Sequence, residues 1–427
     1  MVENLVFEGP YSNKDFFNFI KTSQEPRHRW YYFKEGFSSN VVKEAIDAKS
    51  IKNKSLKILD IFNGCGTTAL TSALLGHHSV GIEINPFLEF TTRVKTNSYS
   101  LKRQTFTDLT NKIINESKLG SFSKLEGFST FTAHSGLDKW LFNTSIIRRY
   151  TAMSEVIDTL PANYRNVFRF ISLSSVMECC NARKDGKGLR YKKNWQAIKY
   201  SSKDLVKAFT NKANIFLDDI EQAPIDSSLK PKIYLGDSRK IMLGDSLTEE
   251  KFDLIVTSPP YLNSFDYSDI YRAELFLGEF VHDNEDLRKI RLNTLRSHVQ
   301  VDWEKTVSYE SIMLKPYSEM LEKVETFWNH RIPLMIRAYF DDMYNVLANA
   351  RKRLRKNAEV WIVVSTSAYA GVHIPVDLLI ADSACQSGYN LKGIHCLRHL
   401  RTSSQQYREL NAKTTPLRES LIILKKQ

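Results

Sequence analysis

The sequence predicts an α/β protein with a doubly wound, mostly parallel sheet, and three observations point to this fold. A strand, a glycine-containing turn, a helix and a second strand follow one another within residues 56–85. Similar apolar strand patterns resume only after residue 230, and the chain closes with two more strand patterns. One sheet assembled from separated segments, with insertions between them, explains this distribution.

The first unit is defined by local patterns. LKILDIF (56–62) predicts a short buried strand, GCGTTA (64–69) a turn, and TALTSALLG (68–76) a helix that ends at Gly76. SVGIEIN (79–85) predicts the next strand. This order is the usual opening of a doubly wound sheet.

The remaining strands and one helix are expected in the second half of the chain. The expected strands are KIYLGDS (232–238), FDLIVTS (252–258), residues 359–365, and a late hairpin of HCLRHLRTSSQQY (395–407) with ESLIILKK (419–426). Apolar residues at helical spacing predict a helix from Ala338 to Lys356. The basic run 351–356 would end this helix before Asn357, where cations complement the helix dipole, so its role is expected to be structural.

Two insertions interrupt this pattern, at residues 99–230 and 283–334. The first is expected to be mostly helical, with a capping box of Ser201 and Asp204 before an apolar stripe. Its segment 181–203 holds eight Lys or Arg residues and one Asp, a net charge of +7. That is more than half of the charge of +12 that 60 Lys+Arg and 48 Asp+Glu give the chain. A polyanionic partner is therefore favoured.

Composition and sequence patterns exclude several classes of protein. A hydrophobic fraction of 42% excludes a mainly disordered chain. The five cysteines form no CxxC pair and are too few for a disulfide framework, so no structural metal is expected. No signal peptide or membrane span is recognisable, and a cytoplasmic protein without a membrane partner is expected.

The glycine turn predicts a nucleotide-like ligand. Gly64, Gly66 and Ala69 match GxGxxG/A between a strand and a helix, and Glu83 ends the following strand. The glycines allow a tight turn and close approach of the backbone to a ligand, while an acid at that position can accept two ribose hydroxyls. The motif alone does not distinguish NAD, FAD and S-adenosylmethionine.

A second motif narrows the choice among these three cofactors. Ser258-Pro259-Pro260-Tyr261 follows a predicted strand, so a rigid turn stands at the carboxyl end of a parallel strand, where α/β sheets bind ligands. Proline fixes φ and removes backbone donors, which leaves the carbonyls of Ser258 and Pro259 as acceptors for an exocyclic amino group. The Tyr261 ring would stack on the base. If the protein were a nicotinamide oxidoreductase, this turn would have no evident role.

These motifs resemble those of the amino-group DNA methyltransferases that use S-adenosylmethionine, whose domain is of the class I methyltransferase type. The family's DPFxGxGTT loop is matched by residues 60–68, and its PPY turn by residues 258–261. The resemblance implies S-adenosylmethionine as cofactor and double-stranded DNA as substrate. The cofactor-binding residues that it implies are Asp60, Phe62, Gly64, Gly66, Thr67, Glu83 and Asp237. HRWYYFKEGFSSNVVKEAI (28–46) resembles, more loosely, the family's remaining cofactor element, in which Phe33, Phe37 and Ser38 are candidates for contact.

The resemblance also organises the chain. The expected divisions are 1–50 as an N-terminal cofactor-site element, 51–98 as the cofactor-binding half, 99–230 as a candidate target-recognition region, 231–282 as the catalytic part, 283–334 as a second insertion, and 335–427 as the remainder of the methyltransferase domain.

A Ser before PPY is typical of the cytosine-N4 branch of the family, whereas Asp or Asn is commoner in the adenine-N6 branch. We therefore expect cytosine-N4 methylation, with adenine-N6 methylation as the alternative. The target base must be flipped out of the duplex, stacked on Tyr261 and held by the Ser258 hydroxyl and the Pro259 carbonyl. An RNA base-amino methyltransferase is a less favoured alternative, because no extra RNA-binding module is recognisable. A subunit that has lost catalysis is disfavoured by the intact motifs.

Target recognition is expected in the first insertion. Its candidates for phosphate or guanine contact are Arg183, Lys184, Lys187, Arg190, Lys192 and Lys193. Residues 288–298 are a second candidate, for which a water-facing amphipathic helix is the stronger interpretation. The resemblance further implies a restriction–modification system, with a restriction endonuclease acting on the same site as the cognate partner.

Overall fold

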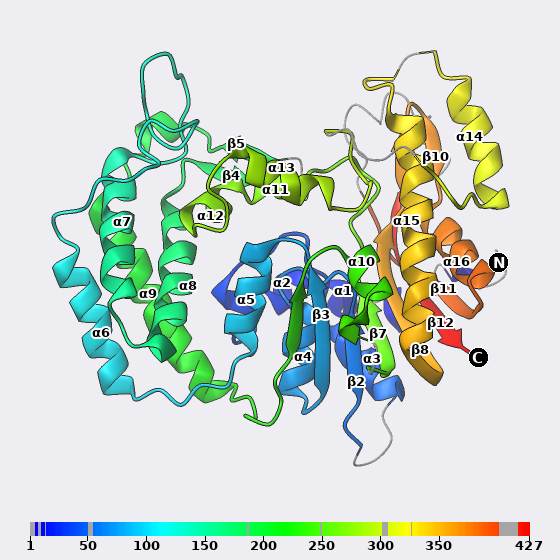
Figure 1. Cartoon of the computed structure of the whole chain (residues 1–427), viewed down its shortest axis with the longest axis horizontal. Coiled ribbons are helices and arrows are strands. Elements are labelled where there is room, and N and C mark those ends of the chain that lie inside the picture. The colour runs from blue at the N-terminus through cyan, green and yellow to red at the C-terminus, as the bar shows by residue number, and fades with distance from the viewer. Residues whose placement is uncertain are drawn as a thin grey trace.

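The computed structural model describes residues 5–6, 10–12, 14–49, 54–185, 188–247, 250–300, 306–325, 327–400 and 417–427. Its central feature is an eight-stranded sheet with the order β1-β11-β12-β8-β7-β2-β3-β6 (Figure 1). The strands are β1 Leu5–Val6, β2 Lys57–Asp60, β3 His78–Glu83, β6 Lys232–Leu235, β7 Phe252–Thr257, β8 Leu354–Ser365, β11 Tyr389–His399 and β12 Arg418–Lys426. The segments β6, β3, β2, β7 and β8 are mutually parallel, whereas β12 runs antiparallel to β8 and β11. The expected mostly parallel, doubly wound sheet is confirmed.

Helices cover both faces of the sheet. One face carries α3 (Ser39–Lys49), and the other carries α10 (Ser238–Leu243), α15 (Ile332–Arg353) and α16 (Val376–Gln386). Alternate residues of a strand serve the two layers, because side chains in a strand point to opposite faces. In β2, Ile58 packs with the α3 cluster, whereas Leu59 packs with the α15 cluster.

The connections on the cofactor side follow the expected pattern. Helix α4 (Thr67–Leu74) joins β2 to β3, and α5 (Pro86–Thr96) follows β3. The remaining short helices of the described chain are α1 Lys14–Phe17, α2 Phe19–Thr22, α11 Tyr267–Ile270, α12 Arg272–Leu277, α13 Asn284–Leu292 and α14 Lys315–Glu322. A short hairpin of β9 (Ser367–Tyr369) and β10 (Val372–Ile374) follows β8.

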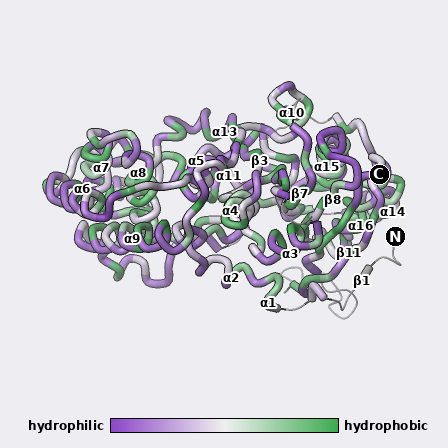
Figure 2. Tube along the Cα trace, turned by 90° about the horizontal axis from the view of Figure 1, so that it is seen from below, coloured by the Kyte–Doolittle hydropathy of each residue, from purple (hydrophilic) through white to green (hydrophobic). Residues whose placement is uncertain are grey.

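The first insertion is largely helical, as expected. Its helices are α6 Arg103–Glu116, α7 Thr144–Asp158, α8 Ala162–Val176 and α9 Ser202–Gln222. They form a lobe beside the sheet in both views (Figures 1 and 2). The capping box of Ser201 and Asp204 is present at the start of α9. A hairpin of β4 (Ala182–Lys184) and β5 (Leu189–Tyr191) lies between α8 and α9 in the sequence.

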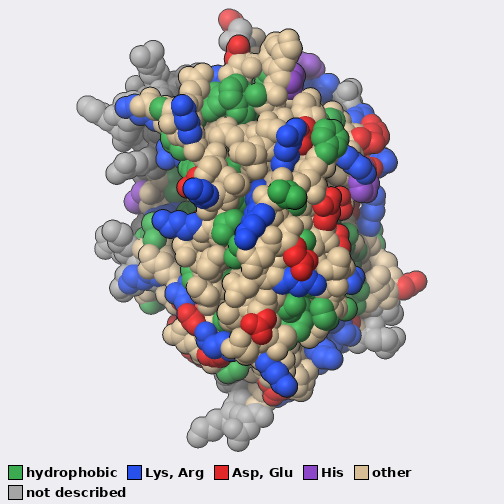
Figure 3. All heavy atoms as spheres, turned by 90° about the vertical axis from the view of Figure 1, so that its left-hand side faces the viewer, with side chains coloured by type: hydrophobic (Ala, Val, Ile, Leu, Met, Phe, Trp, Pro, Cys, Tyr) green, Lys and Arg blue, Asp and Glu red, His purple; other side chains and the backbone are tan. Residues whose placement is uncertain are grey.

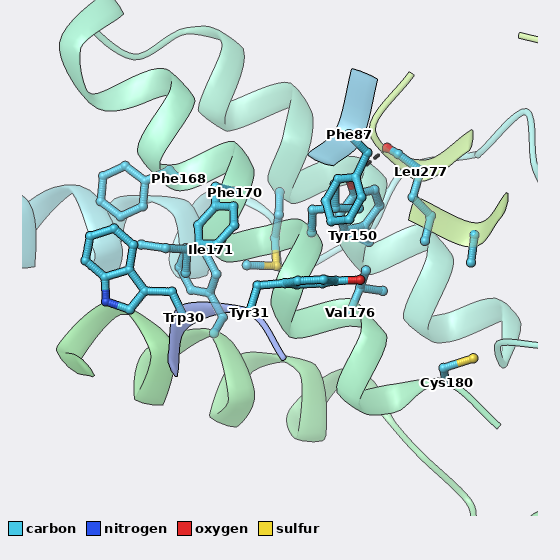
Figure 4. Packing of buried hydrophobic residues seen from close by; sticks show 14 of the residues in the cluster. Trp30, Tyr31, Phe87, Tyr150, Phe168, Phe170, Ile171, Val176, Cys180 and Leu277 are labelled. Carbon is cyan, nitrogen blue, oxygen red and sulfur yellow. Dashed lines mark hydrogen bonds between the residues drawn. The ribbon is translucent and has the colours of Figure 1, made fainter. Parts of the chain in front are cut away.

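The N-terminal element is built into this helical lobe. Trp30 and Tyr31 lie among Phe168, Phe170 and Ile171 (Figure 4). Asp219 of α9 is buried and accepts hydrogen bonds from Arg29 Nε at 3.0 Å and from the Arg27 backbone N–H at 2.8 Å. The insertion therefore shares a core with the segment that leads to residues 33–38.

Two local expectations need correction. The helix expected to reach Lys356 ends at Arg353, and β8 begins at Leu354. Asn357 has a φ of 62° inside β8 and does not cap the helix; the pairing of β7 with β8 shifts register in this stretch. The structural role expected for the basic run is supported, since Arg353 donates to the Gly244 carbonyl at 3.0 Å and Arg355 pairs with Asp253 at 2.5 Å.

The late hairpin is confirmed as β11 and β12, although β11 begins earlier, at Tyr389, than expected. Residues 401–407 of the expected first strand lie outside the described residues. Within the described chain, no helix has both the length and the apolar character needed to cross a bilayer.

Candidate active site

A cavity of about 270 Å³ opens at the carboxyl ends of β2, β3, β6 and β7. The segments after these strands contribute most of its wall, and residues 33–37 of the N-terminal element close one side. Parallel α/β sheets bind ligands at this edge. The cavity contains both sequence motifs, because Gly64, Glu83, Asp237 and the whole Ser258–Tyr261 turn line it.

The glycine loop is held in shape by backbone hydrogen bonds. Asn63 N–H donates to the Ile82 carbonyl at 2.9 Å, and Gly66 N–H donates to the Asn63 carbonyl at 2.9 Å. Gly66 has a φ of +84°, and a Cβ there would lie 2.6 Å from the Thr92 methyl carbon. Both the conformation and the close contact require glycine at this position.

Phe62, Gly64 and Thr67 line the cavity as expected, but Asp60 and Gly66 do not. Asp60 is buried behind the wall, where its Oδ1 accepts from Thr257 Oγ1 at 2.6 Å and from Phe62 N–H at 3.1 Å. Burial raises the pKa of Asp60 to about 6. Asp60 therefore ties the glycine loop to β7 and positions it, rather than facing a ligand through the cavity wall.

Glu83 stands at the end of β3 with both carboxylate oxygens engaged. Oε2 accepts from Gly64 N–H at 2.7 Å, and Oε1 accepts from Asn85 N–H at 2.8 Å. Burial raises the pKa of Glu83 to about 8, although these two N–H groups act in the opposite direction. The carboxyl group is thus fixed at the cavity, where a pair of hydroxyls could reach its remaining lone pairs.

Asp237 caps the N-terminus of α10 and lines the cavity. Its carboxylate is held by Arg239, whose Nη2 lies 2.9 Å from Oδ2 and whose Nη1 reaches Asp342 at 3.0 Å. Asp237 therefore lies at the cavity with an orientation set by Arg239.

The catalytic turn presents a defined set of acceptors. Ser258 Oγ donates to the Val363 carbonyl at 2.9 Å, so its single proton is used and its lone pairs are left to accept. The Pro260 carbonyl accepts from Tyr339 Oη at 3.0 Å. The Pro259 carbonyl accepts no hydrogen bond from the described residues. The turn thus offers Ser258 Oγ and the Pro259 carbonyl as acceptors for an amino group.

Tyr261 is fixed at both ends. Its hydroxyl donates to Glu419 Oε1 at 2.7 Å, and Glu419 Oε2 accepts from Arg398 Nε at 2.8 Å. The backbone N–H of Tyr261 donates to Tyr267 Oη at 3.4 Å. Burial and the Glu419 carboxylate raise the pKa of the Tyr261 hydroxyl well above its ordinary value, so the ring remains neutral.

The N-terminal element meets the expectation in part. Phe33 and Phe37 line the cavity, and Phe33 packs on Gly64, where an added Cβ would lie 3.0 Å from its ring. Ser38 is buried away from the cavity lining, and its Oγ accepts from Asn40 N–H at 3.2 Å.

The polar wall residues that were not among the sequence candidates include Glu35, Asn63 and Asn85. Asn63 lies inside the matched loop and Asn85 follows the strand that ends in Glu83, so the motif context could have indicated both. Glu35 is the only acid in the aromatic segment 28–37, which was the available signal for it.

The basic candidates of the first insertion differ in whether their charge is already paired within the fold. Arg183 and Lys193 are exposed, and neither forms an ion pair with the described residues. Arg190 is 69% exposed and pairs with Asp185 at 2.6 Å. Lys192 donates to Tyr200 Oη at 3.0 Å, and Lys187 lies outside the described residues.

Lys184 differs from the exposed candidates, because its side chain is engaged within the fold. Its side chain is only 14% exposed and forms an ion pair with Glu274, which is 1% exposed. The ammonium also donates to Tyr31 Oη and lies 3.8 Å from the centroid of the Tyr271 ring. Because its charge is already compensated by a buried acid, Lys184 anchors the hairpin to the N-terminal element and is not offered to phosphates.

The second candidate segment, 288–298, is also engaged within the fold. Arg291 pairs with Asp266 at 2.5 Å, and Arg296 pairs with Asp341 at 2.6 Å and with Asp342 at 2.7 Å. The outer face of the helical lobe mixes basic, acidic and hydrophobic side chains (Figure 3). The described residues contain no group of three His, Cys, Asp or Glu side chains that could hold a metal ion.

The residues around the cavity fit a cofactor with an adenosine and an amino-acid part. Asn63 Oδ1 and Asn85 Nδ2 are buried without a hydrogen-bond partner among the described residues. Gly64 lines the cavity with its backbone, and a Cβ there would lie 3.0 Å from the Phe33 ring. These features suit a polar ligand that closely approaches the backbone.

Comparison with known proteins finds similarity to DNA methyltransferases. The family model N6_N4_Mtase, described as "DNA methylase", matches residues 9–92. The chain is 25% identical over 446 residues to the type II methyltransferase M.AvaI of Anabaena variabilis, covering 96% of this chain and 88% of the relative. It is 25% identical over 478 residues to the type II methyltransferase M.BsoBI of Geobacillus stearothermophilus, covering 99% of this chain and 90% of the relative.

A solved structure, the rRNA methyltransferase aviRa from Streptomyces viridochromogenes, matches at 8% identity and a TM-score of 0.29, covering 93% of this chain and 89% of that chain. That similarity is too low to bear on function. The two motifs in one cavity, the match of residues 9–92 to the family model and the nearly full-length similarity to type II methyltransferases support an amino-group DNA methyltransferase family with S-adenosylmethionine as methyl donor.

Proposed function

We propose that this protein is a site-specific DNA methyltransferase that transfers a methyl group from S-adenosylmethionine to the N4 amino group of cytosine. The observation that carries the proposal is the geometry of the Ser258–Tyr261 turn at the cavity. Ser258 Oγ donates its only proton to the Val363 carbonyl, so it meets an incoming N–H group as an acceptor. The choice of cytosine over adenine is supported by Ser at the first position of the turn.

S-adenosylmethionine supplies an electrophilic methyl group on a sulfonium. Ser258 Oγ and the Pro259 carbonyl would accept the two N–H groups of the target amine, which concentrates its lone pair for in-line attack. The Tyr261 ring would stack on the flipped base. A bond from nitrogen to the methyl carbon would form as the carbon–sulfur bond breaks, leaving S-adenosylhomocysteine, and the nitrogen would release one proton to solvent.

Phe62, Gly64, Thr67, Glu83 and Asp237 are the proposed wall of the cofactor site. Glu83 would accept the ribose hydroxyls, and Asp237 would face the adenine amino group. Asp60 and Gly66 would act on the cofactor through the loop that they shape. The place of Gly64, Glu83 and Asp237 in the cavity wall supports this assignment.

Sequence recognition is proposed for the first insertion, with Arg183, Lys187, Arg190, Lys192 and Lys193 as candidate DNA contacts. The relatives' designation as type II methyltransferases supports a role in a restriction–modification system. The partner proposed on that basis is a restriction endonuclease that acts on the same site.

The test is a transfer assay with purified protein, methyl-labelled S-adenosylmethionine, and plasmid DNA or total RNA as substrates. We expect label in DNA, and N4-methylcytosine after digestion to nucleosides. Recovery of N6-methyladenine alone would overturn the choice of base. Label in RNA without label in DNA would overturn the substrate.

A further inference from the structure

Glu35 carries a carboxylate oxygen that the fold leaves unpaired at the cavity. The residue lines the cavity wall. Its Oε2 accepts from Tyr271 Oη at 2.6 Å, whereas its Oε1 is buried without a hydrogen-bond partner among the described residues. A buried carboxylate oxygen without a donor is costly, so a ligand that brings a donor to this oxygen gains the compensating interaction.

The surroundings place this carboxylate between the glycine loop and the catalytic turn. Phe33 packs on Gly64 and stacks on Tyr271 with ring centroids 5.7 Å apart. Burial raises the pKa of the Cys65 thiol in the glycine loop and that of the Tyr267 hydroxyl, and the nearby Glu35 charge adds to both shifts. Tyr267 Oη in turn accepts from the backbone of Tyr261. Glu35 therefore lies near both the glycine loop and the catalytic turn, between which the proposed methyl transfer would take place.

Among the groups of S-adenosylmethionine, only one combines a positive charge with the hydrogen-bond donors that Glu35 Oε1 lacks. A methionine carboxylate would be repelled, and the adenosine part is expected near Glu83 and Asp237. A sulfonium carries charge but has no N–H or O–H to donate. The α-ammonium carries both charge and hydrogen-bond donors, and charge-assisted bonds of this kind are the stronger ones.

We propose that Glu35 binds the α-ammonium group of the cofactor's methionine part, with Tyr271 holding its carboxylate in position. This inference rests on the proposed function, because it concerns the same cofactor site. It adds a binding residue that was not among the sequence candidates of the N-terminal element, and it assigns Tyr271 as a positioning residue.

The test compares two ligands that differ in the amino-acid part. S-adenosylhomocysteine carries the ammonium, whereas 5′-methylthioadenosine keeps the adenosine and the sulfur but lacks the amino acid. Calorimetric titration of the whole chain measures both dissociation constants for the unchanged protein and for Glu35→Gln, which is isosteric and can still accept from Tyr271. We expect Glu35→Gln to weaken S-adenosylhomocysteine binding about 10-fold to 100-fold. Binding of 5′-methylthioadenosine should change by less than about 2-fold.

Two further variants sharpen the result. Tyr271→Phe removes the bond that orients Glu35, and should weaken S-adenosylhomocysteine alone, by less than Glu35→Gln does. Glu44→Gln is the matched control, because Glu44 is exposed on α3 and does not line the cavity. It should leave both ligands unchanged.

Each other outcome has a definite meaning. Equal loss of both ligands in Glu35→Gln, or no loss of either, would overturn the inference. Weaker binding of S-adenosylmethionine with unchanged S-adenosylhomocysteine would assign Glu35 to the sulfonium instead. Failure of the unchanged protein to bind S-adenosylhomocysteine would overturn the proposed function itself, which distinguishes the two failures.

Discussion

The α/β part and the helical insertion place their functional groups in different ways. In the α/β part, the groups that line the cavity stand at the ends of strands, in turns whose backbone conformation is fixed by a few residues. In the insertion, the role of each basic side chain depends on the acid that the fold brings to it. Lys184 meets Glu274, ninety residues later in the chain, whereas Arg183 on the same short strand remains exposed. The role of a motif can therefore be predicted from the local sequence, whereas the role of a cluster of basic residues depends on contacts that the local sequence does not show.

The largest expected effect is in the α/β part. Tyr261→Ala removes the proposed stacking platform and should lower the rate of methyl transfer about 100-fold. Tyr261→Phe keeps the ring and removes only the bond to Glu419, so a much smaller decrease is expected. Single-turnover transfer to DNA measures both, and calorimetric binding of S-adenosylhomocysteine should be nearly unchanged. Normal turnover of the Ala variant would contradict the role of the turn.

The next effect concerns the anchor of the insertion. Lys184→Met removes the charge partner of the buried Glu274 carboxylate, which keeps only the hydrogen bond from Tyr31 Oη, and should destabilise the protein by about 3 kcal/mol. Urea denaturation measures this change, and hydrogen exchange should show it first in residues 182–191. The double variant Lys184→Met/Glu274→Gln removes both charges and should recover most of the stability. Unchanged stability in the single variant would return Lys184 to the group of candidate DNA-binding residues.

A third prediction uses the raised pKa of Glu83. Ribose hydroxyls donate to the ionised carboxyl group, whereas burial holds its pKa in the free protein at about 8, above the ordinary 4.5. The affinity for 5′-methylthioadenosine should therefore rise several-fold between pH 6 and pH 8 and level off above.

The same shift affects folding. The folded protein binds this proton more tightly than the unfolded chain, so the ligand-free protein should lose stability as the pH rises from 4.5 to 8. Glu83→Gln should flatten both the affinity profile and the stability profile. A pH-independent affinity in the unchanged protein would show that Glu83 does not meet the ribose.

The smallest effect tests the exposed charges of the insertion. Arg183→Ala/Lys193→Ala should lower the slope of log Kd for DNA against log salt concentration by about 0.9 for each phosphate that the variant no longer neutralises. Lys207→Ala, an exposed charge on α9 outside the hairpin, is the control and should leave the slope as it is. If the double variant keeps the slope of the unchanged protein, these two side chains belong to a solvated surface.

The sequence predicts the sheet well because its strands and turns are local patterns. The segments 56–62, 79–85 and 252–258 became β2, β3 and β7 with small changes at their ends. The sequence prediction places the end of α15 too late, because it makes Asn357 a helix cap. In the structure, Asn357 adopts its positive φ inside strand β8. The contact of Glu35 with Tyr271 and the pair of Lys184 with Glu274 could not be predicted, because each joins elements that no local pattern connects.

The hydrogen bond from Tyr261 to Glu419 determines when the tyrosine side chain loses its conformational entropy. Glu419 belongs to the C-terminal strand and is itself held by Arg398, so the tyrosine ring is immobilised when the sheet forms. The side-chain entropy of this ring is then lost during folding and not when the base arrives. A flipped base meets a surface that is already rigid, and more of the stacking free energy remains for extracting that base from the duplex.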